Sequence, residues 1–229
     1  MYDNYICSKM ILYIKEVNFV GNRSAISTSV IKRLPRYYRF LDELGKNGMI
    51  RISSNELSRR MGFTASQIRQ DLNCFGGFGQ QGYGYNIQQL KFEIGKILGI
   101  DNLKNAIIIG AGNMGRTLAT NIDFKTRGFK IVGVFDKKQS LIGQLVNGIP
   151  IYDISRIDDF CREMRPDMAV LCIPQEIAKD IATSLINLGI KGFWNFSHYD
   201  LSLDFPDVAI ENVHMGDSLM TLCYNISNN

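Results

Sequence analysis

Two kinds of hydrophobic pattern divide the chain. In the amino-terminal part, apolar residues recur at helical spacing, as from Tyr37 to Leu44, and Pro35 suits the first position of that helix. From about residue 104 onward, unbroken apolar runs such as 106–109 and 168–173 alternate with helical patterns. Such runs are typical of strands buried on both faces, so this part predicts a doubly wound α/β domain with a parallel sheet.

Two capping boxes follow one another in the amino-terminal part. Ser53 with Glu56 opens one predicted helix, and Thr64 with Gln67 opens the next. Gly62 lies between them, where a helix ends most easily in the left-handed conformation. Two short helices joined by a tight turn form a helix-turn-helix pattern.

The outer face of the second predicted helix is polar, and glycines alternate with aromatic residues over 76–85, which indicates a tight hairpin, or wing. Polar side chains on that face can meet base edges and phosphates. This part therefore predicts a winged-helix DNA-binding domain, with a small helical bundle for protein contacts as the alternative. The candidate DNA-binding residues are Arg36, Ser66, Gln67, Arg69, Gln70, Asn73, Gln80 and Tyr83.

A glycine-rich loop follows the first buried strand of the carboxyl-terminal part. Gly110 permits a tight turn, Gly112 lets a pyrophosphate approach the backbone, and Gly115 lets the next helix pack on the strand. Asp136 closes the second strand, where a carboxylate favours NADH/NAD+ over NADP(H). The alternative is a loop whose glycines serve packing alone. The candidate cofactor-binding residues are Gly110, Ala111, Gly112, Asn113, Met114, Gly115, Asp136, Lys137, Ile173 and Pro174.

The charge distribution and the cysteines further limit the kinds of partner and site that this chain can have. Residues 1–100 carry 14 Lys and Arg against 7 Asp and Glu, whereas residues 101–229 carry 12 against 15, which favours an anionic partner for the first half. The five cysteines form no C-x-x-C pair, so we expect reduced cytoplasmic thiols and no zinc site. No uncharged run approaches the roughly 20 residues of a membrane span.

In this order, the motifs resemble the Rex family of redox-sensing transcriptional repressors. The resemblance covers about Ile26 to Tyr224, nearly the whole chain after its first residues. Its most specific stretches are Lys32–Arg39, Ser53–Leu57, Ile68–Leu72, Phe75-Gly76, Gly82–Asn86, Gly110–Gly115, Gly189–Gly192, Asn195-Phe196 and Glu211–Val213.

The resemblance implies a homodimer that binds a palindromic operator in double-stranded DNA and catalyses no reaction. It also implies that NADH releases the DNA and that the terminal helix, about 216–226, is exchanged between subunits. The chain departs from the family at two positions of the switch that senses the reduced nicotinamide, because Asn121 replaces a Tyr and His214 replaces an Asp. The candidate switch and dimer residues are Arg39, Asn121, His214, Met215 and Asp217.

These expectations give a domain plan and leave two other functions open. A CoA- or nucleotide-binding module with an altered NADH response is one alternative, and an NAD-dependent dehydrogenase is the other, although neither histidine lies in a catalytic pattern.

The expected parts are an extension over 1–24, a winged helix over 25–85, a linker helix over 86–103, a Rossmann domain over 104–213 and a dimerisation helix over 214–229.

Overall fold

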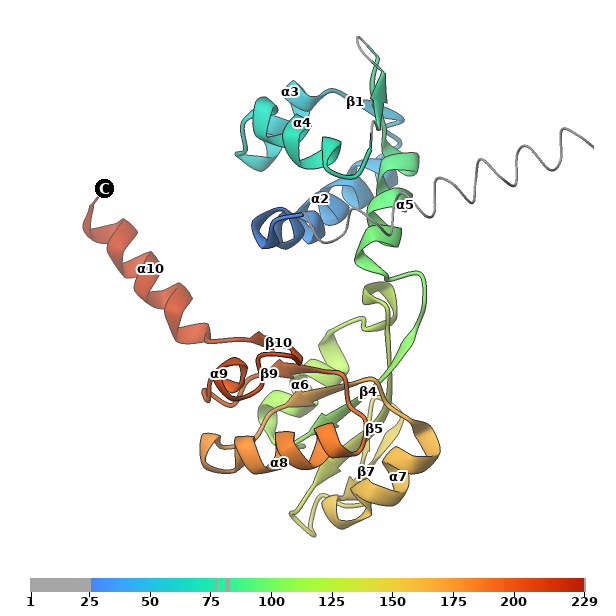
Figure 1. Ribbon diagram of the computed structural model, residues 1–229, viewed down its shortest axis with the longest axis vertical. Helices are drawn as coiled ribbons and strands as arrows, with labels where there is room; N and C mark the ends of the chain where they lie inside the picture. Colours follow the sequence, from blue (N-terminus) through green and yellow to red (C-terminus); the bar gives the residue numbers. More distant parts are fainter. Residues whose placement is uncertain (1–25, 77, 81–82, 229) are drawn as a thin grey trace, which may run out of the picture. The chain divides into compact units, whose positions relative to one another are not determined.

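The computed structural model describes residues 26–76, 78–80 and 83–228, which form two compact units (Figure 1). The first unit ends at Gly99 and the second begins at Ile100. The extension predicted over 1–24 lies outside the described residues. Among the described residues, no helix combines the length and the apolar character that crossing a membrane requires.

The first unit is a winged helix-turn-helix. Its short strands form an antiparallel sheet in the order β1-β3-β2, and α5 packs along α2. The predicted linker helix, α5, thus belongs to this unit. Its elements are α2 (Thr28–Lys46), β1 (Arg51–Ile52), α3 (Ser54–Met61), α4 (Ala65–Asn73), β2 (Gly79–Gln80), β3 (Gly84–Asn86) and α5 (Ile87–Leu98).

Local signals set the starts of α3 and α4 and the end of α3 as predicted, whereas α4 ends at Asn73, before Gly76. The hydroxyl of Ser53 accepts a hydrogen bond from the amide of Glu56 at 3.1 Å, and that of Thr64 accepts one from the amide of Gln67 at 3.1 Å. Gly62 ends α3 with φ of 72°, in the left-handed region. The two caps and this glycine hold the turn of the helix-turn-helix.

The start of α2 differs from the prediction. The helix begins at Thr28, so Pro35 lies inside it rather than at its first position. The reason is that the apolar stripe continues upstream, since Val30 and Leu34 are buried in the same core as Tyr37. Burial of these side chains outweighs the hydrogen bond that proline cannot donate to the carbonyl of Ile31.

The second unit is a Rossmann-type sheet, as predicted. Its order is β10-β9-β8-β4-β5-β7-β6, and all neighbours pair in parallel except β6 with β7. Its elements are β4 (Lys104–Ile109), α6 (Asn113–Asn121), η2 (Lys125–Arg127), β5 (Phe129–Asp136), β6 (Leu145–Val146), β7 (Ile149–Asp153), η3 (Ile154–Arg156), α7 (Ile157–Met164), β8 (Met168–Leu171), α8 (Gln175–Asn187), β9 (Gly192–Asn195), α9 (Leu201–Asp204), β10 (Ala209–Asn212) and α10 (Met215–Ser227).

Two details of this unit were not predicted. A 3-10 turn, η3, precedes α7, and the carboxylate of Asp153 caps this turn by accepting a hydrogen bond from the amide of Ser155 at 2.9 Å. The short elements β6 and α9 carry too few residues for a periodic pattern. Both details are local and leave the sheet topology unchanged.

The two faces of the sheet are covered unequally. Helices α7 and α8 lie on one face and α6 on the other (Figure 1). Along β9, Phe193 is buried beneath the helices of the first face, whereas Trp194 on the α6 face is only half-buried. Glu211, which pairs with Trp194 in register on the edge strand β10, is exposed. The α6 face is thus least covered over β9 and β10.

Candidate DNA interface and nucleotide loop

The polar face of α4 carries four of the predicted DNA-binding residues. Ser66, Arg69, Gln70 and Asn73 are exposed and follow one another at helical spacing, so they share one side of the helix. The guanidinium of Arg69 donates a hydrogen bond from Nη1 to Oγ of Ser54, on α3, at 3.0 Å. In a helix-turn-helix this face enters the major groove.

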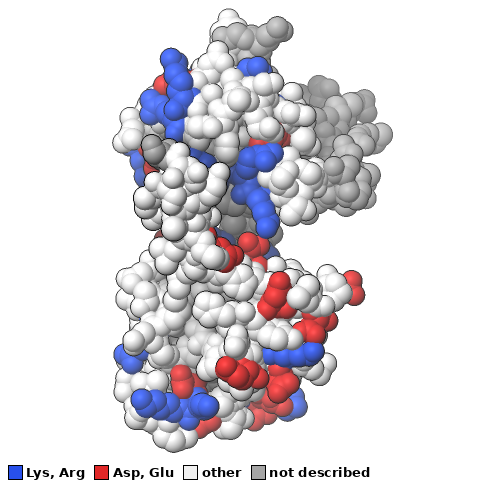
Figure 2. Space-filling view, turned by 90° about the vertical axis from the view of Figure 1, so that its left-hand side faces the viewer, with Lys and Arg blue, Asp and Glu red and all other residues white. Residues whose placement is uncertain are grey.

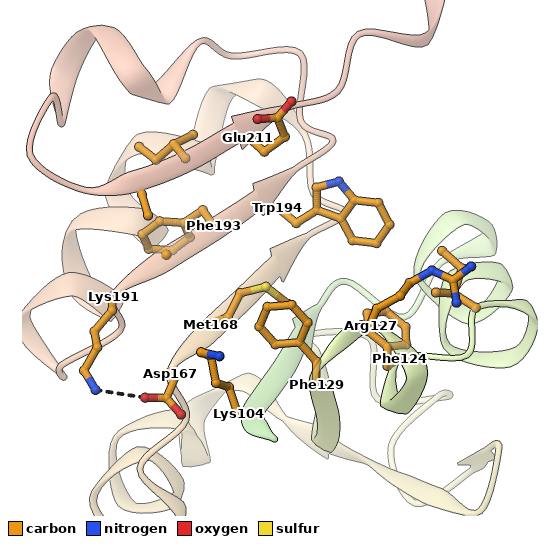
Figure 3. Close-up of a pocket in the computed structure, with 14 residues that line it drawn as sticks. Lys104, Phe124, Arg127, Phe129, Asp167, Met168, Lys191, Phe193, Trp194 and Glu211 are labelled. Carbon is orange, nitrogen blue, oxygen red and sulfur yellow. Dashed lines mark hydrogen bonds and ion pairs between the residues drawn. The ribbon is translucent and has the colours of Figure 1, made fainter. Parts of the chain in front are cut away.

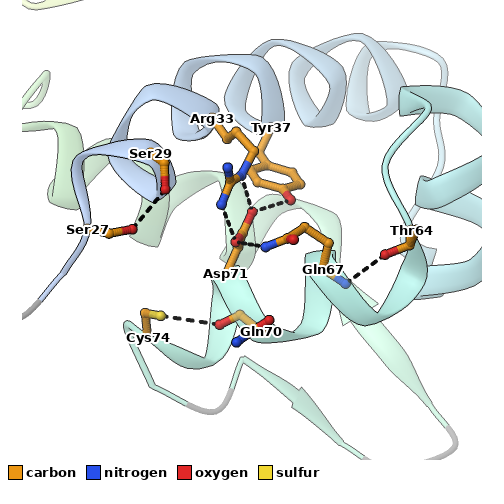
Figure 4. A network of polar contacts seen from close by, with 9 residues as sticks. All are labelled: Ser27, Ser29, Arg33, Tyr37, Thr64, Gln67, Gln70, Asp71 and Cys74. Atoms are coloured by element: carbon orange, nitrogen blue, oxygen red, sulfur yellow. Dashed lines mark hydrogen bonds and ion pairs between the residues drawn. The ribbon is translucent and has the colours of Figure 1, made fainter.

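The opposite side of α4 is held by a buried carboxylate (Figure 4). Asp71, fully buried, accepts hydrogen bonds from Arg33 Nε at 2.7 Å and Nη2 at 2.8 Å, from the Tyr37 hydroxyl at 2.9 Å and from Gln67 Nε2 at 2.8 Å. Four donors saturate its two oxygens. Burial alone would raise the pKa of Asp71, but these hydrogen bonds outweigh it and hold that pKa below its ordinary value.

The same network changes the expectation for Gln67. Its Nε2 already donates to Asp71, so a bidentate contact with adenine would require this bond to break. Gln70, one turn nearer the helix end, is exposed. Sequence reasoning missed Asp71 as an anchor, because its ionic partner Arg33 lies 38 residues away in the chain.

The remaining candidate DNA contacts lie around this helix. Arg36 donates from Nη2 to the carbonyl of Met61 at 2.7 Å and its guanidinium lies 4.8 Å from the ring centroid of Phe63, so it stabilises the end of α3. Tyr83 is exposed at the wing, where its carbonyl accepts from Arg51 at 3.3 Å. The side chain of Gln80 lies outside the described residues.

Charge is distributed as the sequence predicts. On the face shown in Figure 2, basic side chains gather over the winged-helix unit, and acidic side chains are concentrated over the Rossmann unit. A basic surface on a helix-turn-helix unit suits the phosphate backbone of DNA.

The glycine loop between β4 and α6 has the geometry that its spacing predicts. Gly110 has φ of 98°, and a Cβ there would lie 2.3 Å from the carbonyl oxygen of Cys172. A Cβ on Gly115 would lie 1.9 Å from the carbonyl oxygen of Gly110. Both positions therefore exclude any side chain, so the turn and the packing of α6 on β4 depend on glycine.

Gly112 differs from these two glycines in having open space where its Cβ would be. It is the N-cap of α6 and, having no side chain, it makes no side-chain hydrogen bond to the amides of the first turn. Those amides, of Asn113, Met114 and Gly115, point their positive dipole end out of the loop. The loop thus offers an uncapped helix N-terminus and room for a group that approaches the backbone, which fits a pyrophosphate.

Asp136 organises this loop from the neighbouring strand. Its Oδ2 accepts from the amide of Ala111 at 2.6 Å, and its Oδ1 accepts from the amide of Lys138 at 2.8 Å. The carboxylate therefore holds the loop at the carboxyl end of β5, where a ribose hydroxyl of a dinucleotide would lie. Lys137, between these partners in the chain, is exposed.

The carboxyl end of β8 completes the site. Ile173 lies beside the loop, because its Cγ2 would be 3.3 Å from a Cβ on Gly110, and Pro174 is the N-cap of α8. Burial raises the pKa of the neighbouring Cys172 thiol to about 12, so this cysteine stays protonated and unreactive. The predicted residues from β4, β5 and β8 thus meet at one edge of the sheet.

The predicted switch residues are distributed over both units. Arg39 is exposed on α2, and Asn121 is the exposed last residue of α6. His214, the N-cap of α10, stacks on His198 with ring centroids 6.2 Å apart and an interplanar angle of 26°. Met215 and Asp217 are exposed in the first turn of α10. No cluster of three or more metal-ligating side chains occurs among the described residues.

Two apolar surfaces of the second unit lack cover within the described residues. A cavity of about 740 Å³ opens on the α6 face, and Phe124, Phe129, Met168 and Trp194 line it together with the charged side chains of its rim (Figure 3). Helix α10 has no buried residue. Its large exposed apolar side chains are Met215, Leu219, Met220, Leu222, Tyr224 and Ile226.

Two family models match the chain. Residues 25–73 match "Putative DNA-binding protein N-terminus", which covers the helix-turn-helix. Residues 101–199 match "CoA binding domain", which covers the glycine loop and most of the parallel sheet. The two matches fall on separate structural units.

Curated relatives and solved structures extend this similarity over nearly the whole chain. The redox-sensing transcriptional repressor Rex of Thermoanaerobacter sp. (strain X514) is 49% identical over 208 residues, covering 91% of this chain and 92% of that protein. Rex of Clostridium perfringens (strain SM101 / Type A) is 48% identical over 208 residues, with coverage of 90% and 97%.

Crystal structures of the Rex-family repressor RSP also match. The complex with β-NAD+ and operator DNA has a TM-score of 0.82 at 49% identity, covering 89% of this chain and 93% of that one. The complex with β-NADH has a TM-score of 0.81 at 46% identity, with coverage of 89% and 95%. The chain therefore belongs to the Rex family of redox-sensing transcriptional repressors.

Proposed function

We propose that this chain is a DNA-binding transcriptional repressor whose affinity for its operator depends on the NADH/NAD+ ratio. The observation that carries the proposal is the open space at Gly112 beside the uncapped N-terminus of α6, in a chain that also exposes a helix-turn-helix face. A repressor of this kind acts where the DNA is, so we also propose a cytoplasmic location.

The Rossmann unit would hold the dinucleotide. The amides of the first turn of α6 would bind the pyrophosphate, and Asp136 would accept hydrogen bonds from a ribose. A carboxylate at that position also repels a 2′-phosphate, which favours NADH and NAD+. The nicotinamide would extend toward Ile173 and Pro174 at the end of β8. Structures of the relative RSP with β-NAD+ and with β-NADH support the choice of these two ligands.

The winged-helix unit would bind double-stranded operator DNA. The exposed face of α4 would enter the major groove, with Arg69 and Gln70 toward base edges and Ser66 and Asn73 toward bases or the backbone. Gln67 and Arg36 serve mainly to hold the unit together in this proposal, because their polar groups are engaged within it. Tyr83 and Gln80 of the wing would add contacts to the phosphates.

We propose a homodimer, which the two uncovered surfaces support. Parallel sheets are normally covered on both faces, and the α6 face around Trp194 is open over β9 and β10. Helix α10 exposes several large apolar side chains, which one copy leaves in water. A second copy related by a two-fold axis would cover such surfaces on both subunits at once, and its symmetry would match a palindromic operator.

The switch would couple the two units through the base of α10. We assign Arg39, Asn121, His214, Met215 and Asp217 to it on the family pattern. His214 stacks on His198 and carries no carboxylate, so it cannot pair with Arg39 as an acid would. Asp217, one turn along α10, is the acid that remains available in this segment, and we propose it as the substitute.

We propose that the chain catalyses no reaction, since the family consists of regulators and hydride transfer needs a positioned acid or base. One observation favours a second ligand, because residues 101–199 match a CoA-binding domain. Calorimetry with CoA and with NADH on the same preparation separates the two. A clear preference for CoA would contradict the assignment of Asp136 as the residue that accepts hydrogen bonds from the ribose of NADH.

The test of the proposed function has two parts. Selection from a pool of randomised duplex DNA should enrich a palindrome, and titration should show NADH fluorescence enhanced on binding. A Gly112→Trp variant fills the open space beside α6, so it should lose nucleotide binding and keep DNA binding. Loss of both activities would mean that the loop is only structural.

A further inference from the structure

The guanidinium of Arg69 is restrained by a second helix before any DNA is present. Arg69 lies on the exposed face of α4, and its Nη1 donates to Oγ of Ser54 at 3.0 Å. Ser54 is the first residue of α3 and is half-buried, although the hydrogen bond itself is exposed to solvent. This is a side-chain bond between the two helices of the helix-turn-helix.

The charge of Arg69 also acts on the wing. Tyr85 belongs to β3 and is almost fully buried. Burial raises the pKa of Tyr85, and the positive charge of Arg69 opposes that rise.

The chemistry of the Ser54 hydroxyl suits an anchor for Arg69. Its oxygen accepts the hydrogen bond that the guanidinium donates, and this bond restricts the directions in which the guanidinium can point. Arginine has a long side chain that loses much rotamer freedom when it is fixed on a base or phosphate. A hydrogen bond already formed in the free protein reduces that loss.

We propose that Ser54 is a positioning residue for DNA recognition, which orients the Arg69 guanidinium at the surface that reads the operator. This inference rests on the proposed function, because it assigns one determinant of the same DNA-binding site. Ser54 acts through Arg69 in this account, so its contribution should vanish when Arg69 is absent.

The experiment is a double-mutant cycle on the full-length protein. The probes are a duplex that the wild-type chain selects from a randomised pool and a scrambled duplex of the same composition. The variants are Ser54→Ala, Ser54→Thr, Arg69→Ala and the double variant, with Ser58→Ala, one turn further along α3, as the matched control. Melting temperatures verify that each variant is folded.

Ser54→Ala should weaken binding of the selected duplex by roughly 3- to 10-fold, as expected for the loss of one solvent-exposed hydrogen bond of ordinary strength. Binding of the scrambled duplex should change by less than about 2-fold, and Ser54→Thr should restore selective binding. In the Arg69→Ala background, Ser54→Ala should have almost no further effect, since the partner is gone.

Other results would overturn the inference. Equal losses from Ser54→Ala with and without Arg69 would mean that Ser54 contacts DNA independently, and a loss equal to that of Ser58→Ala would indicate a general effect on α3. A wild-type chain that selects no sequence at all would instead overturn the proposed function, and this inference with it. The two failures are therefore distinguishable.

Discussion

Arg33 and Asp71 form a two-point ion pair between α2 and α4, with Nε to Oδ2 at 2.7 Å and Nη2 to Oδ1 at 2.8 Å. The carboxylate is fully buried, and the guanidinium side chain is 24% exposed. The pair thus fixes the inner side of α4 while the outer side stays free for DNA. Removing one partner of such a pair leaves the other charge uncompensated.

We therefore expect Asp71→Ala to destabilise the winged-helix unit by about 3 to 5 kcal/mol. The reason is that Arg33, Tyr37 and Gln67 lose their shared acceptor at once. Urea unfolding followed by circular dichroism measures the change. Asp42→Ala is the control, because Asp42 also pairs with two cations, Lys46 and Lys91, but its side chain is 30% exposed. The control should cost at most about 1 kcal/mol.

The same carboxylate predicts a pH dependence. The pKa of Asp71 is lowered in the folded state from its ordinary value of 3.8, so its stabilising contribution is complete well above that value. That contribution should be lost progressively as the pH falls below about 4 toward the folded pKa. Unfolding curves across this range should show a steeper acid loss for wild type than for Asp71→Asn. Parallel curves would contradict the assignment.

Gly115 and Gly112 should respond differently to substitution. A Cβ on Gly115 would lie 1.9 Å from the Gly110 carbonyl oxygen, whereas one on Gly112 meets open space. Gly115→Ala should therefore lower the melting temperature of the Rossmann unit by several degrees. Gly112→Ala should leave stability nearly unchanged and weaken NADH binding. Differential scanning calorimetry and NADH titration separate these effects, and equal melting temperatures for the two variants would contradict the packing argument.

Asp136 should set both the affinity and the choice of dinucleotide. Its carboxylate accepts a hydrogen bond from the amide of Ala111 at 2.6 Å and lies where we propose that a ribose of the dinucleotide binds. Asp136→Ser should weaken NADH binding by roughly 10-fold, which corresponds to about 1.4 kcal/mol. It should also narrow the preference for NADH over NADPH, since the repelling charge is gone. Fluorescence titrations with NADH and with NADPH measure both affinities. An unchanged ratio of the two would contradict the assignment of Asp136 to the ribose site.

The elements that sequence could predict are those set by local chemistry. Ser53 and Thr64 cap their helices because the capping residue and its amide partner are three positions apart. Gly110 and Gly115 have the local roles that their spacing predicts, since the left-handed φ of Gly110 makes the turn and Gly115 packs against the carbonyl of Gly110, five residues before it. The order of apolar runs was likewise sufficient to predict the parallel sheet.

The features that could not be predicted from the sequence depend on contacts between residues far apart in the chain. In the sequence, Asp71 cannot be distinguished from the other polar residues of its helix. Its burial depends on Arg33 and Tyr37 of α2, which donate hydrogen bonds to it. Pro35 marks a helix start by local preference, yet buried residues before it extend the helix. The half-buried Trp194 looks like core in a strand pattern, because no local signal reveals which face of a sheet lacks a helix.

We propose that the NADH/NAD+ ratio controls how tightly this protein binds its operator. The most direct measurement is fluorescence anisotropy of a labelled operator duplex, selected by the wild-type chain, with NADH or NAD+ added in turn to the full-length protein. We expect NADH to release the duplex, NAD+ to leave it bound, and Gly112→Trp to abolish release without abolishing binding. Operator affinity that is the same with NADH, with NAD+ and without either would contradict it.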